Sequence, residues 1–131
     1  MRPTLLILGL LLLSGCGGHG SVQSPDAGRA NIEPVNHKEE TLAFLRTYLN
    51  DPSGVREAAI SPPVLKNIGS QNRYAACLRF NAKKGDGEYA GRKERLAVFL
   101  SGRFDTLVET VRDQCKDAVY EPFPELERLS R

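Results

Sequence analysis

The chain contains little histidine, no tryptophan and a single methionine. Its two histidines are His19, in a glycine-rich segment, and His37, at the end of that segment. A Ser-His-Asp or Cys-His mechanism needs an imidazole held rigidly within hydrogen-bonding distance of its nucleophile. The scarcity of histidine therefore argues against these hydrolases and against histidine-rich metal sites. We expect neither a metal ion nor another cofactor.

A large excess of charge of one sign is also missing. The chain has 18 lysines and arginines against 16 aspartates and glutamates, a net charge of +2, and the two signs are interspersed. A nucleic-acid-binding domain usually carries a strongly basic face, and an interaction tail is usually a block of like charges. We therefore do not expect nucleic acid as a partner.

No apolar run approaches the roughly 20 residues that a membrane-spanning helix requires. The apolar run Leu5–Leu13 is short, follows the positively charged Arg2 and ends in small residues. These three features together are typical of a secretory signal peptide. We predict that residues 1–15 form such a peptide.

The end of this run reads Leu13-Ser14-Gly15-Cys16, a leucine, two small residues and a cysteine. It resembles the lipobox of bacterial lipoproteins. The resemblance implies that the Cys16 thiol receives a diacylglyceryl group and that the chain is cut before Cys16. It also implies that the new amino terminus is acylated, for example with palmitate. Two or three acyl chains hold a protein firmly at a bilayer, at ~0.8 kcal/mol per buried methylene. The alternative is an ordinary signal peptide with an unmodified cysteine nearby.

The residue after Cys16 is Gly17, where lipoproteins retained in the inner membrane often carry aspartate. The resemblance therefore implies a cell-envelope protein at the periplasmic face of the outer membrane. Residues 16–36 are rich in glycine, serine and proline, so they bury too little apolar surface to fold alone. We predict a flexible tether that spans roughly 25 Å, followed by a single small domain at residues 37–131.

Two cysteines, Cys77 and Cys115, remain after the lipidated one. The envelope is oxidising, and small secreted domains often contain disulfides because their cores are thin. We predict a Cys77–Cys115 disulfide, which in the chain-entropy model stabilises the fold by about 3–4 kcal/mol. Two buried free thiols are the alternative. Two cysteines without a nearby histidine make a poor zinc site.

The spacing of apolar residues predicts one helix followed by several strands. In the helix, residues 38–50, leucines recur on one face. In the strands, apolar and polar residues alternate, and prolines indicate an edge position. We predict strands at residues 55–60, 72–84 and 92–102, the last two forming an antiparallel hairpin, and we expect Val64, Leu65 and Ile68 to pack at an edge of the sheet.

The pattern of residues 104–118 fits either a strand or a helix. Phe104, Leu107 and Val111 have helical spacing, whereas Ser101-Gly102 has the composition of a hairpin turn. We predict a short strand over residues 104–108 and then a helix over residues 109–118. The chain end, with Phe123, Leu126 and Leu129, is expected to pack onto the sheet as a lid.

These elements predict an α+β domain. Its N-terminal helix packs on a three- to four-stranded antiparallel sheet, and a second short helix lies near the C-terminus. The predicted disulfide joins that second helix to the sheet.

Two carboxylate pairs, Asp105 with Glu109 and Asp113 with Asp117, are four residues apart, as two residues on one helical face would be. A glycosidase needs two carboxylates about 5–10 Å apart across a cleft. Pairs at this spacing also arise by chance in a domain rich in acidic residues. The chain has no tryptophan to stack on a sugar, so we assign no catalytic residue.

Glycines and basic residues surround the loop of the predicted hairpin, residues 83–91. The loop lacks the G-K-[ST] ending of a phosphate-binding loop and has too few acids for an EF-hand. We expect the flanking basic cluster to be a solvated surface, because Glu88 and Glu94 reduce its net positive charge. The alternative is that it contacts anionic headgroups or a partner. The cluster consists of Lys83, Lys84, Arg92, Lys93 and Arg95.

The domain also resembles a group of small bacterial lipoproteins and secreted proteins of unknown function. The residues that carry the resemblance are Asp51-Pro52-Ser53, Asn81-Ala82-Lys83, Tyr89-Ala90-Gly91 and Phe123-Pro124-Glu125-Leu126. The similarity covers most of the domain. It implies no activity, so it supplies no functional residues.

Together these observations predict an envelope lipoprotein that is a non-enzymatic binding or structural module. Its expected partners are the lipid bilayer, through acylated Cys16, and an envelope protein or the cell wall. The alternative is a small carboxylate-dependent envelope hydrolase.

The anchor and the disulfide are tested together by the intact mass of protein purified from membranes. We expect the mass of residues 16–131 plus acyl groups, lower by two hydrogens before reduction than after it. An unacylated chain with free thiols would contradict both predictions and make the three cysteines candidates for redox or metal chemistry.

Overall fold

The computed structural model describes residues 31–110 and 113–130 of the chain. The predicted signal peptide, the lipobox with Cys16, and His19 lie outside the described residues, as does most of the predicted tether. The elements follow one another as α1 (His37–Tyr48), β1 (Asp51–Ile60), β2 (Val64–Ile68), β3 (Gln71–Lys83), β4 (Lys93–Leu100), β5 (Arg103–Glu109), β6 (Glu121–Pro122) and α2 (Pro124–Glu127). Neither helix is long and apolar enough to span a membrane.

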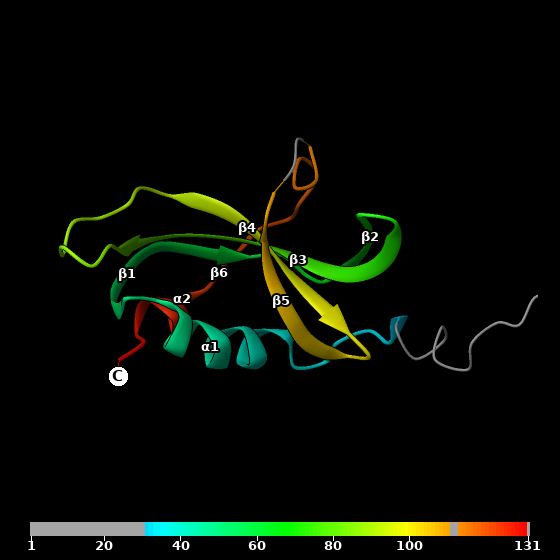
Figure 1. Cartoon of the computed structure of the whole chain (residues 1–131), viewed down its shortest axis with the longest axis horizontal. Coiled ribbons are helices and arrows are strands. Elements are labelled where there is room, and N and C mark those ends of the chain that lie inside the picture. The colour runs from blue at the N-terminus through cyan, green and yellow to red at the C-terminus, as the bar shows by residue number, and fades with distance from the viewer. Residues whose placement is uncertain (1–30, 111–112, 131) are drawn as a thin grey trace, which may run out of the picture.

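The described strands form one sheet in the order β5-β4-β3-β1-β6, and β2 also pairs with β3. Every pairing is antiparallel. The α+β class and the antiparallel sheet are confirmed. The predicted strand number was too low, because β2 and β6 are short and lie beside prolines. Figure 1 shows the long β3 and β4 running through the sheet, with α1 along one side.

β1 and β2 behave as one long strand interrupted at Ser61-Pro62-Pro63. Both pair with the same edge of β3, β1 near its end and β2 near its start. At the break, the Ser61 amide donates to the Cys77 carbonyl (2.8 Å), and the Cys77 amide donates to the Ser61 hydroxyl (2.8 Å). The serine hydroxyl thus accepts the bond from the Cys77 amide at the point where the strand pairing is interrupted, so this buried amide is not left unpaired.

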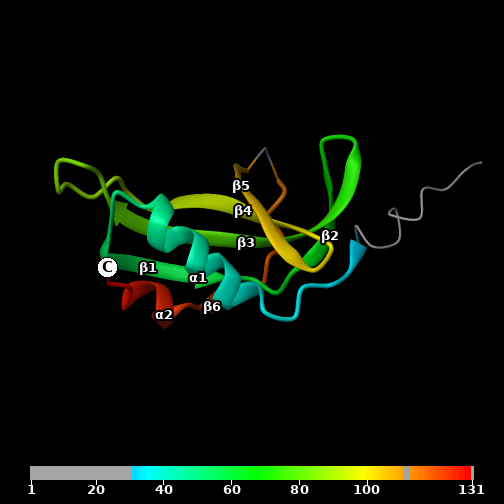
Figure 2. The same ribbon diagram turned by 60° about the horizontal axis from the view of Figure 1, so that its bottom comes forward.

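The first core lies between the sheet and the two helices. Leu45 of α1 and Leu126 of α2 are fully buried there against strand residues. The largest fully buried strand residues in this core are Ile60, Leu78 and Phe99. The predicted lid is confirmed, since Phe123 and Leu126 are fully buried and Leu129 nearly so. Figure 2 shows both helices on the same side of the sheet.

Two contacts dock the start of α1 onto β5. The Glu40 carboxylate accepts a hydrogen bond from the Phe104 amide and pairs with the Arg103 guanidinium. One turn later, the Phe44 ring stacks on Phe104 with centroids 4.6 Å apart. The apolar face predicted for this helix therefore contacts the sheet through the Phe44–Phe104 pair, beside the ion pair of Glu40 with Arg103.

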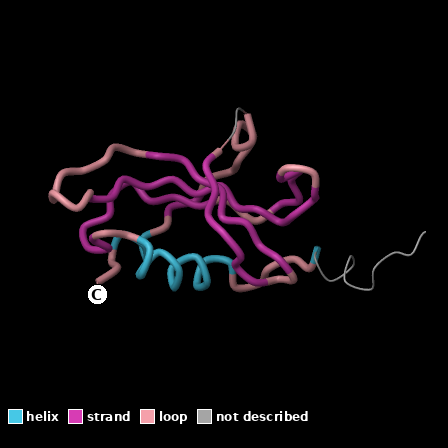
Figure 3. The backbone as a smooth tube through the Cα atoms, in the orientation of Figure 1, coloured by secondary structure: helices cyan, strands magenta, loops and turns pink. Residues whose placement is uncertain are grey.

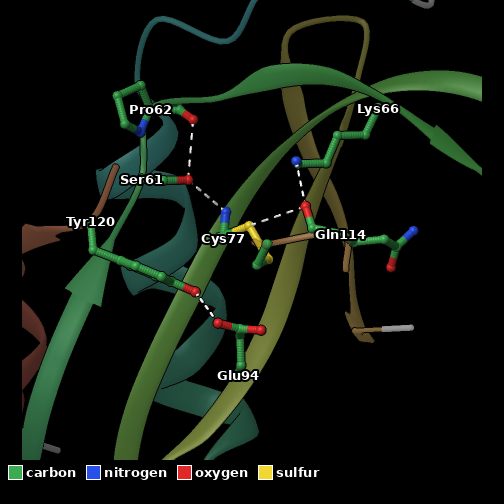
Figure 4. Close-up of a disulfide and its surroundings, with 8 residues drawn as sticks. Ser61, Pro62, Lys66, Cys77, Glu94, Gln114 and Tyr120 are labelled. Carbon is green, nitrogen blue, oxygen red and sulfur yellow. Dashed lines mark hydrogen bonds between the residues drawn. A yellow bond between two sulfur atoms is a disulfide. The ribbon is translucent and has the colours of Figure 1, made fainter. Parts of the chain in front are cut away.

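A second core covers the other face of β3 and β4. It contains Ala75, Cys77, Leu96 and Val98, and is covered by Cys115. The predicted disulfide is confirmed: Cys77 and Cys115 are bonded, with Cα atoms 5.8 Å apart. In Figure 4 the bond lies beside the Ser61 contact, and Lys66 donates to the Gln114 carbonyl (2.6 Å) next to it.

The helix predicted over residues 109–118 is wrong. β5 continues to Glu109, and residues 113–117 form turns with bonds from Lys116 to Asp113 (3.1 Å) and from Ala118 to Cys115 (3.2 Å). Leu107 packs in the first core, whereas Val108 packs in the second. Successive side chains that enter opposite faces need a strand, so the short strand predicted over residues 104–108 is confirmed within β5. For the described residues 113–118, Figure 3 shows loop where the helix was predicted, and the short C-terminal helix is α2 instead.

Removing the disulfide should weaken the whole fold. We expect the double substitution Cys77→Ala and Cys115→Ala to lower the free energy of unfolding by about 2–4 kcal/mol. Urea denaturation of the oxidised protein and of the variant measures this difference. Wild-type protein held in reductant is the matched control and should approach the variant. Equal midpoints in all three samples would show that the bond does not constrain the fold.

Candidate functional site

The β3–β4 hairpin extends past the end of α1 and leaves a cavity of about 370 Å³ there. Its position follows from the lengths of the elements: α1 ends at Tyr48, whereas β3 runs on to Lys83. We call it the hairpin cavity. The lining residues that define it are Tyr48 and Leu49 of the helix end, Phe80 and Ala82 of β3, and Lys93 and Arg95 of β4.

Register places the basic and apolar lining residues on one face of the sheet. Phe80 is paired with Lys93, and Leu78 with Arg95. Residues directly opposite in an antiparallel pair share a face. Phe80 and Leu78 belong to the first core, so Lys93 and Arg95 lie on the helix side, where that core opens to solvent.

Hydrogen bonds brace the loop that closes the cavity. The Gly91 amide donates to the Asn81 side-chain carbonyl (2.9 Å), and the Ala90 amide donates to the Ala82 carbonyl (2.9 Å). At the loop tip, the Glu88 amide donates to the Asp86 carboxylate (2.9 Å). This bond to the ionised form lowers the pKa of Asp86.

Tyr89 ties the same loop to β1. Its hydroxyl donates to the Gly54 carbonyl (2.6 Å), and the Arg56 guanidinium lies 4.1 Å from its ring centroid. Gly54 has φ +67°, and a Cβ there would meet the Lys83 ammonium nitrogen at 3.2 Å. The left-handed backbone at this position therefore favours glycine. The walls of the cavity are braced from both sides of the loop.

The charge around the hairpin cavity is strongly one-sided. No aspartate or glutamate belongs to the described lining. Lys84 is paired with Asp86 at 3.5 Å, and Arg95 with Glu109 at 3.4 Å. Within residues 31–110 and 113–130, Lys93 has no ion pair. The cavity thus joins an apolar floor to cations that are only partly compensated.

A second cavity, of about 340 Å³, lies beside β6 and is internally compensated. Its Tyr120 hydroxyl donates to the Glu94 carboxylate (2.6 Å), and the Arg79 guanidinium lies 4.1 Å from the Tyr120 ring centroid. Arg92 is 4.0 Å from Glu57. Partial burial, followed by the bond to Glu94, raises the pKa of Tyr120 well above its usual value. Tyr120 therefore stays protonated and donates to Glu94.

A third cavity, of about 310 Å³, lies between β2 and the segment that carries Cys115. Its one basic lining residue, Lys66, donates to the Gln114 carbonyl. Its lining includes Asp117 and the exposed Val119. The charged side chains of these two smaller cavities are largely engaged within the protein.

Neither carboxylate pair singled out in the sequence lies on a helix. Asp105 and Glu109 lie on a strand and are exposed, and Glu109 pairs with Arg95. Asp113 and Asp117 lie in the turn region and are exposed. Neither pair faces across a cavity, since only Asp117 lines one of those described here. Across the described ranges, no cluster of three His, Cys, Asp or Glu residues suits a metal ion.

His37 is the first residue of α1 and is half-buried. Burial, with the nearby Lys38, lowers the pKa of His37. Its carbonyl accepts a bond from the Thr41 hydroxyl (2.6 Å), so its structural contacts are those of a helix start.

The structure regroups the basic cluster found in the sequence. Lys83, Lys84, Lys93 and Arg95 all line the hairpin cavity, whereas Arg92 reaches Glu57 beside the second cavity. The Lys83 ammonium group lies 5.8 Å from the Tyr89 ring centroid. Sequence reasoning missed the contribution of Tyr48 and Leu49, because nothing in the sequence tells where a helix end lies relative to a distant hairpin.

Three of the motifs behind the family resemblance meet at this end of the domain. Asn81 bonds to Gly91, and Tyr89 bonds to Gly54, next to Asp51-Pro52-Ser53. The Ser53 amide donates to the Asp51 carboxylate (2.9 Å), which shapes the start of β1. These motifs therefore shape the loop and the strand start that border the hairpin cavity.

Comparison with known proteins gives no assignment: no family model, curated protein or solved structure matches the chain. The resemblance to small envelope lipoproteins stays a prediction. The function is therefore inferred from the cavities of the domain and the side chains that line them.

The Tyr120–Glu94 bond is testable by Tyr120→Phe. We expect the free energy of unfolding to fall by about 1 kcal/mol, the scale of a charge-assisted bond that water partly replaces. Chemical denaturation measures the change. Tyr48→Phe is the matched control, because the exposed Tyr48 packs on Phe44 through its ring. An equal effect in the two variants would show that the Glu94 bond adds no stability.

Proposed function

We propose that the chain is an envelope lipoprotein whose domain works as a non-enzymatic binding module. In this proposal residues 1–15 are removed and acylated Cys16 anchors the protein at the periplasmic face of the outer membrane. The partner is an envelope protein or a component of the cell wall. The single observation that carries the binding role is the hairpin cavity, with its apolar floor and partly uncompensated cations.

The place of the cavity in the domain supports this role. Ile32 lies against the β4–β5 turn, since a Cβ on Gly102 would meet its side chain at 3.2 Å. The cavity lies at the other end of β4, near Lys93. Figures 1 and 2 both show the coloured segment before α1, from residue 31, and the β3–β4 loop at opposite ends of the described domain. A domain held from its N-terminal side would present the cavity away from its anchor.

The separation between these two ends is substantial. β4 runs from Lys93 to Leu100, which is roughly 23 Å at about 3.3 Å per residue. This length adds to the reach of the predicted tether. The geometry favours a partner beyond the headgroups of the anchoring membrane.

A binding role is also favoured over the hydrolase alternative. The carboxylate pairs considered for hydrolysis are exposed and do not converge on a cavity. A carboxylate acid catalyst gains its raised pKa from a desolvated site, and exposed carboxylates lack such a site. The positions of these carboxylates therefore favour a binding module over a hydrolase.

Site-specific photo-crosslinking in cells tests the proposal. A photoreactive phenylalanine analogue at Tyr48, which is 56% exposed on the cavity rim, should give a reproducible adduct. The same analogue at Thr106, exposed on β5, is the matched control and should give none. Cys16→Ser behind an ordinary cleavable signal peptide should move the protein out of the membrane fraction and weaken the adduct. Equal labelling at both positions, or none at Tyr48, would contradict the proposal.

A further inference from the structure

The floor of the hairpin cavity is apolar and well packed. Phe80 and Ala82 are each 8% exposed and belong to the first core. Leu49 packs against the same core from the helix end. Ligand pockets are usually lined by apolar groups with a few polar groups at defined places, and have volumes of roughly 300–1,000 Å³. The hairpin cavity, at about 370 Å³, is large enough for a small ligand with an apolar portion.

Two cations border that floor from the neighbouring strand. Lys93 and Arg95 are two residues apart on β4, so they share a face and their Cα atoms are roughly 7 Å apart. The Arg95 side chain is 21% exposed, whereas that of its partner Glu109 is 83% exposed. The carboxylate of that pair is therefore solvated and weakly held. An incoming anion can compete for Arg95 and neutralise Lys93.

We propose that the hairpin cavity binds single molecules of an anionic amphiphile. A carboxylate or phosphate group lies against Lys93 and Arg95, and a short apolar portion lies on Phe80 and Ala82. This inference rests on the proposed binding function and names the chemical class of its ligand. Lys93 and Arg95 match the anionic group, and Phe80 and Ala82 match the apolar portion. A free inorganic anion or a neutral hydrocarbon would contact only one of these two pairs.

The geometry favours single amphiphile molecules over an anionic bilayer surface. The floor lies between the helix end, the β3–β4 hairpin and the braced loop, so a ligand must enter it. A flat surface would reach the rim, at Tyr48 and Lys84, without contacting Phe80. The ligand therefore has to leave its own membrane or micelle, at least at the end that binds.

Binding is measured with octyl phosphate below its micelle concentration. The protein is the mature chain, residues 16–131, carrying Cys16→Ser, which removes the predicted acylation site. We expect saturable binding in titration calorimetry, with shifts of the backbone amides of Phe80, Ala82 and Gly91 in NMR spectra. Inorganic phosphate alone and octyl glucoside each lack one half of the chemistry. Both should bind at least about tenfold more weakly, because each loses one set of contacts.

Lys93→Gln tests the anion contact without breaking a native ion pair. We expect octyl phosphate affinity to fall about tenfold, the scale of a lost charge-assisted contact. Lys116→Gln is the matched control. Lys116 is exposed in the turn region on the opposite face of the sheet and does not line the cavity. This control should leave the affinity unchanged.

Several outcomes would overturn the inference. Equal binding of inorganic phosphate would reduce the site to an anion site, and equal binding of octyl glucoside would reduce it to an apolar one. Equal effects of Lys93→Gln and Lys116→Gln would place the ligand elsewhere. Binding to vesicles of anionic phospholipid without binding to octyl phosphate would show surface attachment. The crosslinking test at Tyr48 stands apart, since a macromolecular adduct there with no octyl phosphate binding would support the binding module and refute this ligand class.

Discussion

The disulfide between Cys77 and Cys115 is the constraint on which the rest of the domain depends. Cys77 lies at the middle of β3, where four consecutive residues are buried, as they are in β4. Strands buried on both faces need a cover on each side. Helices cover one face, whereas the other is covered by a segment that forms only turns around Cys115. Such a segment has few backbone bonds of its own, so the covalent bond keeps it on the sheet.

Because the centre of β3 and β4 is held from both sides, their far ends can extend beyond the helix. There the first core opens into the hairpin cavity, and the loop between the strands is braced by Tyr89 and Asn81 rather than by packing. A braced, partly open end of this kind costs less to organise around a ligand than a mobile loop would. The division between a disulfide-bonded centre and an open end is consistent with the binding role proposed for this domain.

Much of the fold was predictable because it depends on local patterns. The leucine spacing of α1, the alternation in β3 and β4 and the Ser101-Gly102 turn are each contained in a few consecutive residues. The turn is confirmed, with φ +53° and +77° at these two residues. The strand β6 was missed because two residues paired through a distant strand leave no local signal. The helix over residues 109–118 was wrong because its described apolar residues, Cys115 and Ala118, cover the second core from a segment of turns that the disulfide attaches to β3.

The hairpin cavity likewise combines features that local sequence predicts with features that depend on distant contacts. The sequence by itself determined the basic cluster, the glycine loop and the helix that carries Tyr48, since composition and short-range periodicity specify these. Only the tertiary structure decided that Lys93 and Arg95 share a face with Phe80, that Arg92 turns to Glu57, and that the helix ends beside them. Strand register and the relative lengths of packed elements set those relations. Both arise from contacts between residues that are far apart in the chain.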